Sequence, residues 1–187
     1  MASSEVATLA GPYSDFASIG GAALDMTPAA RGVTLSPTDR GRILQGMLTL
    51  PAHPDARDGL QTMRDASLRL VTLTNSAPTA VQQQLANAGL ATFFERSFSV
   101  DTVRRFKPAA EAYRSVADSL EVPVDRLRLV AAHAWDIVGA LRAGCAAAFV
   151  VRPGKVLYPL GPKPDIAGPD FRSVAKLIVT AETQPPR

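Results

Sequence analysis

Cysteine, histidine and long apolar runs are scarce in this sequence. Among its 187 residues Cys145 is the single cysteine, which excludes an intramolecular disulfide and a cysteine-rich zinc site. One cysteine is typical of a reducing compartment, so we expect a cytoplasmic protein. No apolar run approaches the roughly eighteen residues of a membrane span, and the first residues lack the basic and apolar segments of a secretory signal. We therefore expect no membrane partner.

The histidines and the charges exclude two further classes of site. Because His53 and His133 are the only histidines, a multi-histidine metal centre is excluded. The net charge is +3, and the arginines are scattered singly apart from Arg104-Arg105. Nucleic-acid binders usually concentrate their cations on one face or in one run, so we expect no nucleic-acid partner. Apolar residues at 47% and charged residues at 20% are ordinary for a globular protein.

Helical and strand patterns alternate from Ser36 onward, whereas residues 1–35 are weakly periodic and rich in small residues. Short, nearly all-apolar segments that end at polar residues are typical of buried parallel strands. Strand–helix units that repeat in this way predict an α/β fold, a Rossmann-like parallel sheet with helices on both faces. The expected strands lie at 68–74, 97–101, 126–132 and 146–151, and the expected helices lie at 37–50, 55–65, 78–88, 108–120, 134–143 and around 171–178.

Polar residues follow three of the expected strands, and ligands of such sheets bind at the carboxyl ends of the strands. Lys107 precedes Pro108 at the start of a helix, where a cation is unfavourable unless an anion shares the place. The alternative is a solvated surface lysine. Thr74-Asn75-Ser76 could hold a carboxylate or phosphate, or could simply cap the next helix.

The third loop contains His133, Trp135 and Asp136. A carboxylate such as Asp136 is favourable in the first turn of a helix without any function. His133 could act as an acid–base group, as a hydrogen-bond donor or as a half-buried structural histidine. Trp135 could belong to the core or stack on a ligand. The convergence of all three loops on one edge of the sheet favours a site for a small anion.

Three segments resemble the type II (S)-2-haloacid dehalogenases of the haloacid dehalogenase superfamily. They are LVTLTNSAP, VDTVRRFKPAAEAY and LVAAHAWDIVGALRAG, and the resemblance covers about 36–178. It implies a haloacid dehalogenase core at 53–187 and a remnant of a helical cap at 1–52. It also implies hydrolytic dehalogenation of small 2-haloacids through an aspartyl ester, without a metal or other cofactor, and a homodimer.

The resemblance assigns roles to the loop residues. Thr74, Asn75 and Ser76 would hold the substrate carboxylate, and Tyr113 and Trp135 would line its pocket. Lys107 would orient and charge-balance a nucleophilic Asp. Asp136 would pair with this lysine and, with His133, help to position water. Ala132 stands where phosphatase relatives carry a magnesium-binding acid, so the resemblance favours metal-free chemistry.

The nucleophile motif of the family, an Asp followed by x-x-Gly-Thr after a hydrophobic residue, does not occur in the sequence. Asp25 is the nearest imitation, and it lies only 49 residues before Thr74. The sheet is therefore expected to lack a central strand and to expose strand edges. Two alternatives to an incomplete dehalogenase remain: a non-catalytic or repurposed relative that binds small carboxylates, and, least favoured, a phosphatase.

Overall fold

Five short parallel strands form two separate sheets in the structure, which is a computed structural model that describes residues 11–183. In the first sheet β1 (Val71–Thr74) pairs with β2 (Arg96–Ser99). In the second, the order is β3 (Arg128–Ala131), β4 (Ala146–Val150) and β5 (Ile166–Gly168). Residues 1–10, which include most of the segment without secretory features and the start of the expected cap remnant, lie outside the described residues.

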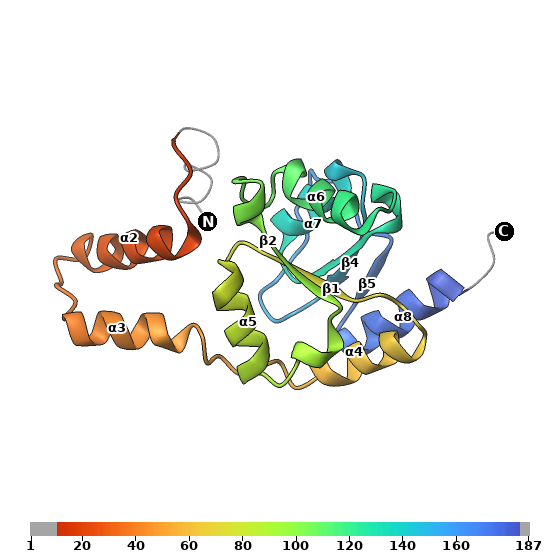
Figure 1. The fold of residues 1–187 in the computed structure, drawn as a ribbon, viewed down its shortest axis with the longest axis horizontal. Helices are drawn as coiled ribbons and strands as arrows, with labels where there is room; N and C mark the ends of the chain where they lie inside the picture. The colour runs from red at the N-terminus through yellow and green to blue at the C-terminus, as the bar shows by residue number, and fades with distance from the viewer. Residues whose placement is uncertain (1–10, 184–187) are drawn as a thin grey trace.

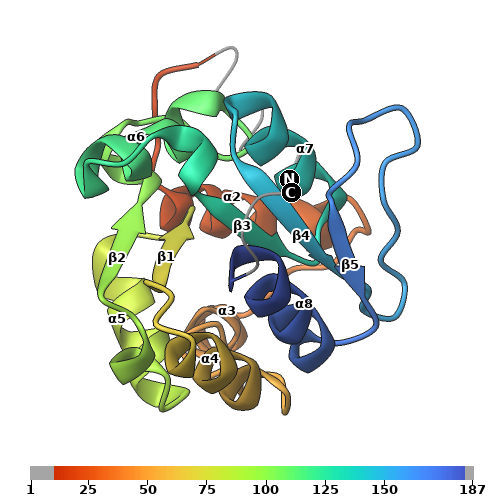
Figure 2. The ribbon, with the colours of Figure 1, turned by 90° about the vertical axis from the view of Figure 1, so that its right-hand side faces the viewer.

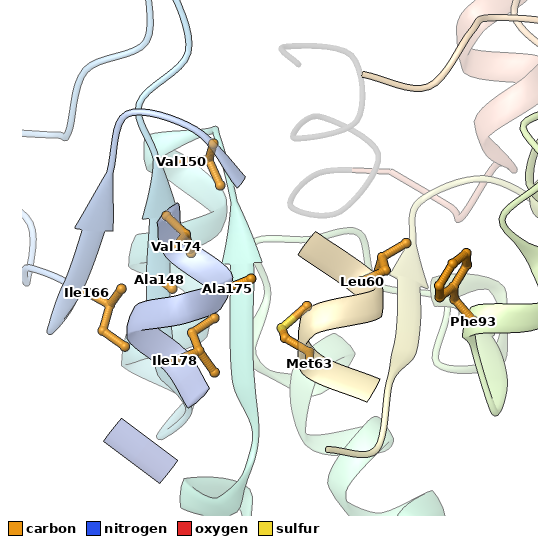
Figure 3. Packing of buried hydrophobic residues seen from close by; sticks show 9 residues of the cluster. All are labelled: Leu60, Met63, Phe93, Ala148, Val150, Ile166, Val174, Ala175 and Ile178. Carbon is orange, nitrogen blue, oxygen red and sulfur yellow. The ribbon is translucent and has the colours of Figure 1, made fainter. Parts of the chain in front are cut away.

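Helices cover both faces of these sheets (Figure 2). In β4, Ala148 and Val150 pack in one core cluster, whereas Ala147 and Phe149 pack in another on the opposite face. The first cluster includes buried residues of α4 (Ala56–Asp65) and α8 (Phe171–Thr183), as Figure 3 shows. The other face carries α6 (Ala110–Leu120) and α7 (Ala134–Ala143), and α5 (Pro78–Asn87) follows β1. This arrangement confirms the predicted α/β fold with helices on both faces.

The buried carboxylate of Asp55 joins the start of the core to its end. Its two oxygens accept hydrogen bonds from the guanidinium of Arg152, each at 2.8 Å, and one of them accepts from the backbone N–H of Phe171 at 2.7 Å. The Arg152 guanidinium, and to a lesser extent this N–H group, lowers the pKa of Asp55 to about 2 despite the opposing effect of burial. α4 and α8 are thereby held side by side.

Two helices lie to one side of the sheets, α2 (Phe16–Ala29) and α3 (Pro37–Gly46) (Figure 1). α3 begins as predicted, with the Ser36 hydroxyl accepting from the N–H of Asp39 at 3.1 Å. α2 was not among the expected elements, because its small residues give a weak periodic pattern. The assignment of 1–52 to a cap and 53–187 to a core stays a prediction. No helix within 11–183 has the length and apolar character needed to cross a membrane.

The edge strand β1 of the first sheet and the edge strand β3 of the second lie on opposite sides of a gap. Among the described strands, β1 is hydrogen-bonded only to β2, and the only such neighbour of β3 is β4. A cavity of about 760 Å³ lies between them, lined by residues 67–73 on one side and 126–132 on the other. We call this cavity the strand slot. Within residues 11–183 no strand lies between β1 and β3, and the expected lack of a central strand stays a prediction.

Candidate active site

An ion pair between Lys107 and Asp136 lies where the parallel strands end. The Lys107 Nζ is 2.7 Å from Asp136 Oδ2, and the two side chains are only 10% and 7% exposed. Asp136 stands in the first turn of α7, five residues after the end of β3, and Lys107 lies in the loop between β2 and α6. The structure thus brings together two residues that are 29 positions apart in the sequence. Together they form a nearly dry, charge-balanced centre.

Tyr113 is hydrogen-bonded to the second oxygen of the Asp136 carboxylate. Its hydroxyl donates to Asp136 Oδ1 at 2.6 Å, and the residue is buried. Burial, and then the negative charge of Asp136, raises the pKa of Tyr113 well above its usual value, so the phenol stays a hydrogen-bond donor. Both oxygens of Asp136 are therefore engaged, one by a cation and one by a neutral donor. This fixes the carboxylate and leaves it poorly suited to attack a substrate itself.

The turn after β1 meets the Lys107 loop through a side-chain amide. Asn75 Oδ1 accepts from the backbone N–H of Lys107 at 3.0 Å. The hydroxyl of Thr74 accepts from the N–H of Ser76 at 3.1 Å, and the Ser99 hydroxyl donates to the Ser76 carbonyl at 2.8 Å. These bonds hold the predicted turn beside the N-terminus of α5, a place that favours an anion. Thr74, Asn75, Lys107 and Asp136 therefore belong to one cluster.

His133 and Trp135 lie at the rim of this cluster. Lys107 Nζ is 5.8 Å from the centre of the Trp135 ring, and the rings of Trp135 and His133 are also 5.8 Å apart. His133 Nε2 is 3.3 Å from the Nζ of Lys155. Burial, followed by the positive charge of Lys155, lowers the pKa of His133, so the imidazole is neutral near pH 7. A neutral imidazole can accept or pass on a proton.

Three neighbours of the site were missed at the sequence level. Lys155 belongs to a loop after β4, and no pattern connects it with His133. Gly139 in α7 allows close packing, since a Cβ atom there would lie 2.6 Å from both Tyr113 Oη and Pro108 Cβ. Tyr13 stacks on Phe106, the residue before Lys107, at 5.2 Å, and its hydroxyl donates to Asp101. The chain before α2 thereby supports the Lys107 loop.

Asp25 lies apart from this cluster. It belongs to α2 and forms an exposed ion pair with Arg40 of α3, with a distance of 2.9 Å between Asp25 Oδ1 and Arg40 Nε. Figure 1 shows both helices to one side of the sheets. Among residues 11–183, no group of three or more histidine, cysteine or acidic side chains is placed to hold a metal ion. The described part of the site thus consists of a lysine, a fixed carboxylate and neutral polar groups.

Comparisons with known proteins agree with this arrangement. A model of the haloacid dehalogenase-like hydrolase family matches residues 16–144. The chain is 28% identical over 159 residues to (S)-2-haloacid dehalogenase H-109 of Pseudomonas putida, covering 85% of this chain and 71% of that protein. It is 33% identical over 144 residues to the (S)-2-haloacid dehalogenase of Xanthobacter autotrophicus, covering 77% of this chain and 56% of that one.

A solved structure of similar fold is the L-2-haloacid dehalogenase from Xanthobacter autotrophicus with chloropropionic acid covalently bound. The two superpose with a TM-score of 0.86 at 27% identity, over 94% of this chain and 80% of that one. These matches confirm the resemblance seen in the three sequence segments. A fifth of the solved chain has no counterpart in the alignment.

Proposed function

Because the chain belongs to the family of haloacid dehalogenase-like hydrolases, we propose that its site serves the hydrolytic removal of halide from small 2-haloacids. The observation that carries the proposal is the buried Lys107–Asp136 pair, with Tyr113 on Asp136 and Asn75 on the backbone of Lys107. A lysine held this rigidly can orient a second carboxylate beside it. The sequence relatives and the solved structure support the choice of substrate class.

The reaction has two steps on a carboxylate nucleophile. A carboxylate oxygen attacks the carbon that bears the halogen, the carbon–halogen bond breaks, and the halide leaves with the electron pair. Water then attacks the carbonyl carbon of the resulting ester, which releases the 2-hydroxy acid and a proton and restores the carboxylate. His133, neutral near pH 7, is a candidate to take the proton from this water. Thr74, Ser76 and the N-terminus of α5 would hold the carboxylate of the substrate.

The nucleophile itself has no good candidate among the described acids of the site. Asp136 is engaged on both oxygens, and Asp25 pairs with Arg40 on the surface. We therefore expect the chain as printed to bind a 2-haloacid without turning it over. Turnover should appear when a strand that ends in Asp-x-x-Gly-Thr precedes the chain and fills the missing position in the sheet.

The test measures chloride release from 2-chloropropionate. The 187-residue chain is compared with an extended protein that carries such a strand before the first residue. The matched control is the same extended protein with Asn in place of the Asp of the added strand. We expect release only from the extended version, and we expect Lys107→Ala in that version to abolish it. An extended protein that is folded by circular dichroism but releases no chloride would contradict the proposed function.

A second candidate function is the binding of small carboxylates without covalent chemistry. The engagement of Asp136 and the position of Asp25 favour it, because they leave no free carboxylate nucleophile among the site residues within 11–183. Calorimetry with propionate and 2-chloropropionate should then give binding that is lost in Lys107→Ala. A phosphatase remains the least favoured function because Ala132 has no metal-binding side chain, and magnesium-dependent hydrolysis of a phosphoester would revive it.

We also propose that the protein is a homodimer. Several large apolar side chains on and beside α2 and α3 are exposed, a pattern typical of an interaction surface; they are Met26, Val33, Ile43, Met47 and Leu50. Sedimentation velocity would detect the dimer, and Met26→Lys would be expected to weaken it. A cytoplasmic location, expected from the single Cys145, stays a prediction.

A further inference from the structure

We infer that a second cavity, on the side of α7 opposite the buried Ile137 and Ala140, binds a small aromatic carboxylate. This cavity, which we call the α7 cavity, lies between the start of α6, the exposed side of α7 and Tyr158. Its volume is about 650 Å³, within the range of roughly 300–1,000 Å³ that is typical of ligand pockets. Among the described residues, none lines both this cavity and the strand slot. The inference therefore does not rest on the proposed function.

Small residues between two aromatic rings create the hollow. Ala110, Ala134 and Gly139 line the α7 cavity with little or no side chain, whereas Trp135 and Tyr158 contribute rings to its walls. Aromatic rings prefer to stack on, or to meet edge to face, another ring. A ligand that carries an aryl ring therefore matches these walls better than a compact polar molecule does.

The wall formed by Tyr158 is anchored to the core, although the loop that carries it is long. Leu157 packs against the cluster of Ile137 and the strand β4. At Gly161 the loop approaches α7 so closely that a Cβ atom would lie 2.5 Å from Val138 Cγ2. The carbonyl of Tyr158 accepts hydrogen bonds from Lys163 Nζ at 2.6 Å and from the backbone N–H of Gly161 at 3.2 Å. The α7 cavity is therefore formed in advance of ligand binding.

Arg142 determines the charge of the ligand. It is the only charged residue among the described residues that line the α7 cavity, and it is exposed. Within residues 11–183 no acid forms an ion pair with it. A guanidinium binds a carboxylate through two parallel N–H···O hydrogen bonds. An apolar hollow with one unpaired guanidinium at its rim thus suits an aromatic ring that carries a single carboxylate.

The α7 cavity adjoins the candidate active site through neighbouring residues of the chain. Pro108 lines it directly after Lys107, and Trp135 lines it directly before Asp136. Because Trp135 is the single tryptophan, a ligand in this cavity changes the environment of the only indole in the protein. Intrinsic tryptophan fluorescence therefore reports binding at this place.

The experiment titrates the full chain with phenylacetate and follows the fluorescence of Trp135, excited where phenylacetate does not absorb. Phenylacetamide is the uncharged control ligand, because it has the same ring and nearly the same shape. We expect a saturable change with phenylacetate and binding at least about fivefold weaker with phenylacetamide. Arg142→Leu should weaken phenylacetate binding about tenfold, and Arg142→Lys less, since lysine keeps the charge without the paired donors. Arg42→Leu, at an exposed arginine of α3, is the matched control and should change nothing.

Circular dichroism checks the fold of each variant, and Tyr158→Ala provides a second test of the cavity wall that should also weaken binding. The absence of a saturable change would overturn the inference, as would equal affinities for phenylacetate and phenylacetamide or unchanged binding in a folded Arg142→Leu. Ser76→Ala, in the turn after β1, should leave phenylacetate binding unchanged. A loss there equal to that in Arg142→Leu would place the ligand in the candidate active site and overturn the inference. A fluorescence change that follows protein concentration would assign the cavity to a second copy, with the same consequence.

Discussion

The buried pair of Lys107 and Asp136 makes Asp136→Asn an informative substitution for stability. Asparagine has nearly the same volume as aspartate, and its amide oxygen can still accept the hydrogen bond of Tyr113. The change therefore removes one charge and leaves the ammonium of Lys107 without a partner at 10% exposure. At 2.7 Å, an effective dielectric constant of about 20 gives an attraction of roughly 6 kcal/mol between the two charges.

Most of that attraction offsets the cost of removing both charges from water, so the measurable quantity is the penalty for the unpaired lysine. Breaking a buried pair on one side costs about 3–5 kcal/mol of unfolding free energy, a large share of a total of about 5–15 kcal/mol. For a chain of this size the melting temperature should fall by roughly 6–20 °C. Lys107→Met in the Asp136→Asn background removes the stranded charge, and about 1.5 kcal/mol or more should be recovered.

Guanidinium unfolding followed by circular dichroism and by the fluorescence of the single tryptophan provides the assay, because Trp135 is 5.8 Å from Lys107 Nζ. Arg172→Met is the control, since it removes an ion pair with Asp58 whose side chains are 51% and 58% exposed. That change should alter the unfolding free energy by less than about 1 kcal/mol. A loss below about 1 kcal/mol for Asp136→Asn, with no recovery in the double variant, would refute the reasoning.

Three further predictions concern packing, acid stability and thiol reactivity. Gly139→Ala should lower the unfolding free energy by about 1–3 kcal/mol in denaturant titrations, because its Cβ would clash with Tyr113 and Pro108, whereas Gly41→Ala on the open side of α3 should not destabilise. The pKa of Asp55 is about 2 in the folded protein, against 3.8 for the free side chain. Its ionised form therefore adds about 2 kcal/mol to the unfolding free energy above pH 4, and this contribution is lost as the pH falls from about 4 to 2. The unfolding free energy measured at a series of pH values should show this fall, and Asp55→Asn should reduce it. Burial raises the pKa of Cys145 to about 11, so a thiol reagent at pH 8 should label the folded chain at least about a hundredfold more slowly than the unfolded one; equal rates would contradict its burial.

Local signals in the sequence were sufficient for the elements with clear ends. The helix predicted at 134–143 is observed with the same bounds, because Gly144 adopts a left-handed conformation that ends it. α3 likewise follows from Ser36 and Pro37. α2 was not predicted, since it depends on Asp15 as its cap and on the packing of Phe16 against Phe106, which is 90 residues away in sequence. β5 is only three residues long and owes its conformation to pairing with β4.

The site was predictable as a place rather than as a set of contacts. Parallel strands bring their carboxyl ends to one edge, so the meeting of Asn75, Lys107 and Asp136 follows from topology. The hydrogen bond from Tyr113 to Asp136 depends on the close approach of α6 to α7 at Gly139, which no local pattern encodes. The contact of Lys155 with His133 depends on the path of the loop after β4, which tertiary packing determines.

The hydrogen bonds of Asp55 to Arg152 and Phe171 have a consequence for synthesis on the ribosome. The Asp55 carboxylate accepts a hydrogen bond from the backbone of Phe171, which is made 116 positions later. The apolar side of α4 likewise packs against α8, which contains Phe171. Until α8 has emerged from the ribosome, Leu60 and Met63 lack the residues of that helix that pack in the same cluster. We therefore expect the apolar side of α4 to stay accessible to chaperones during synthesis until α8 has been made.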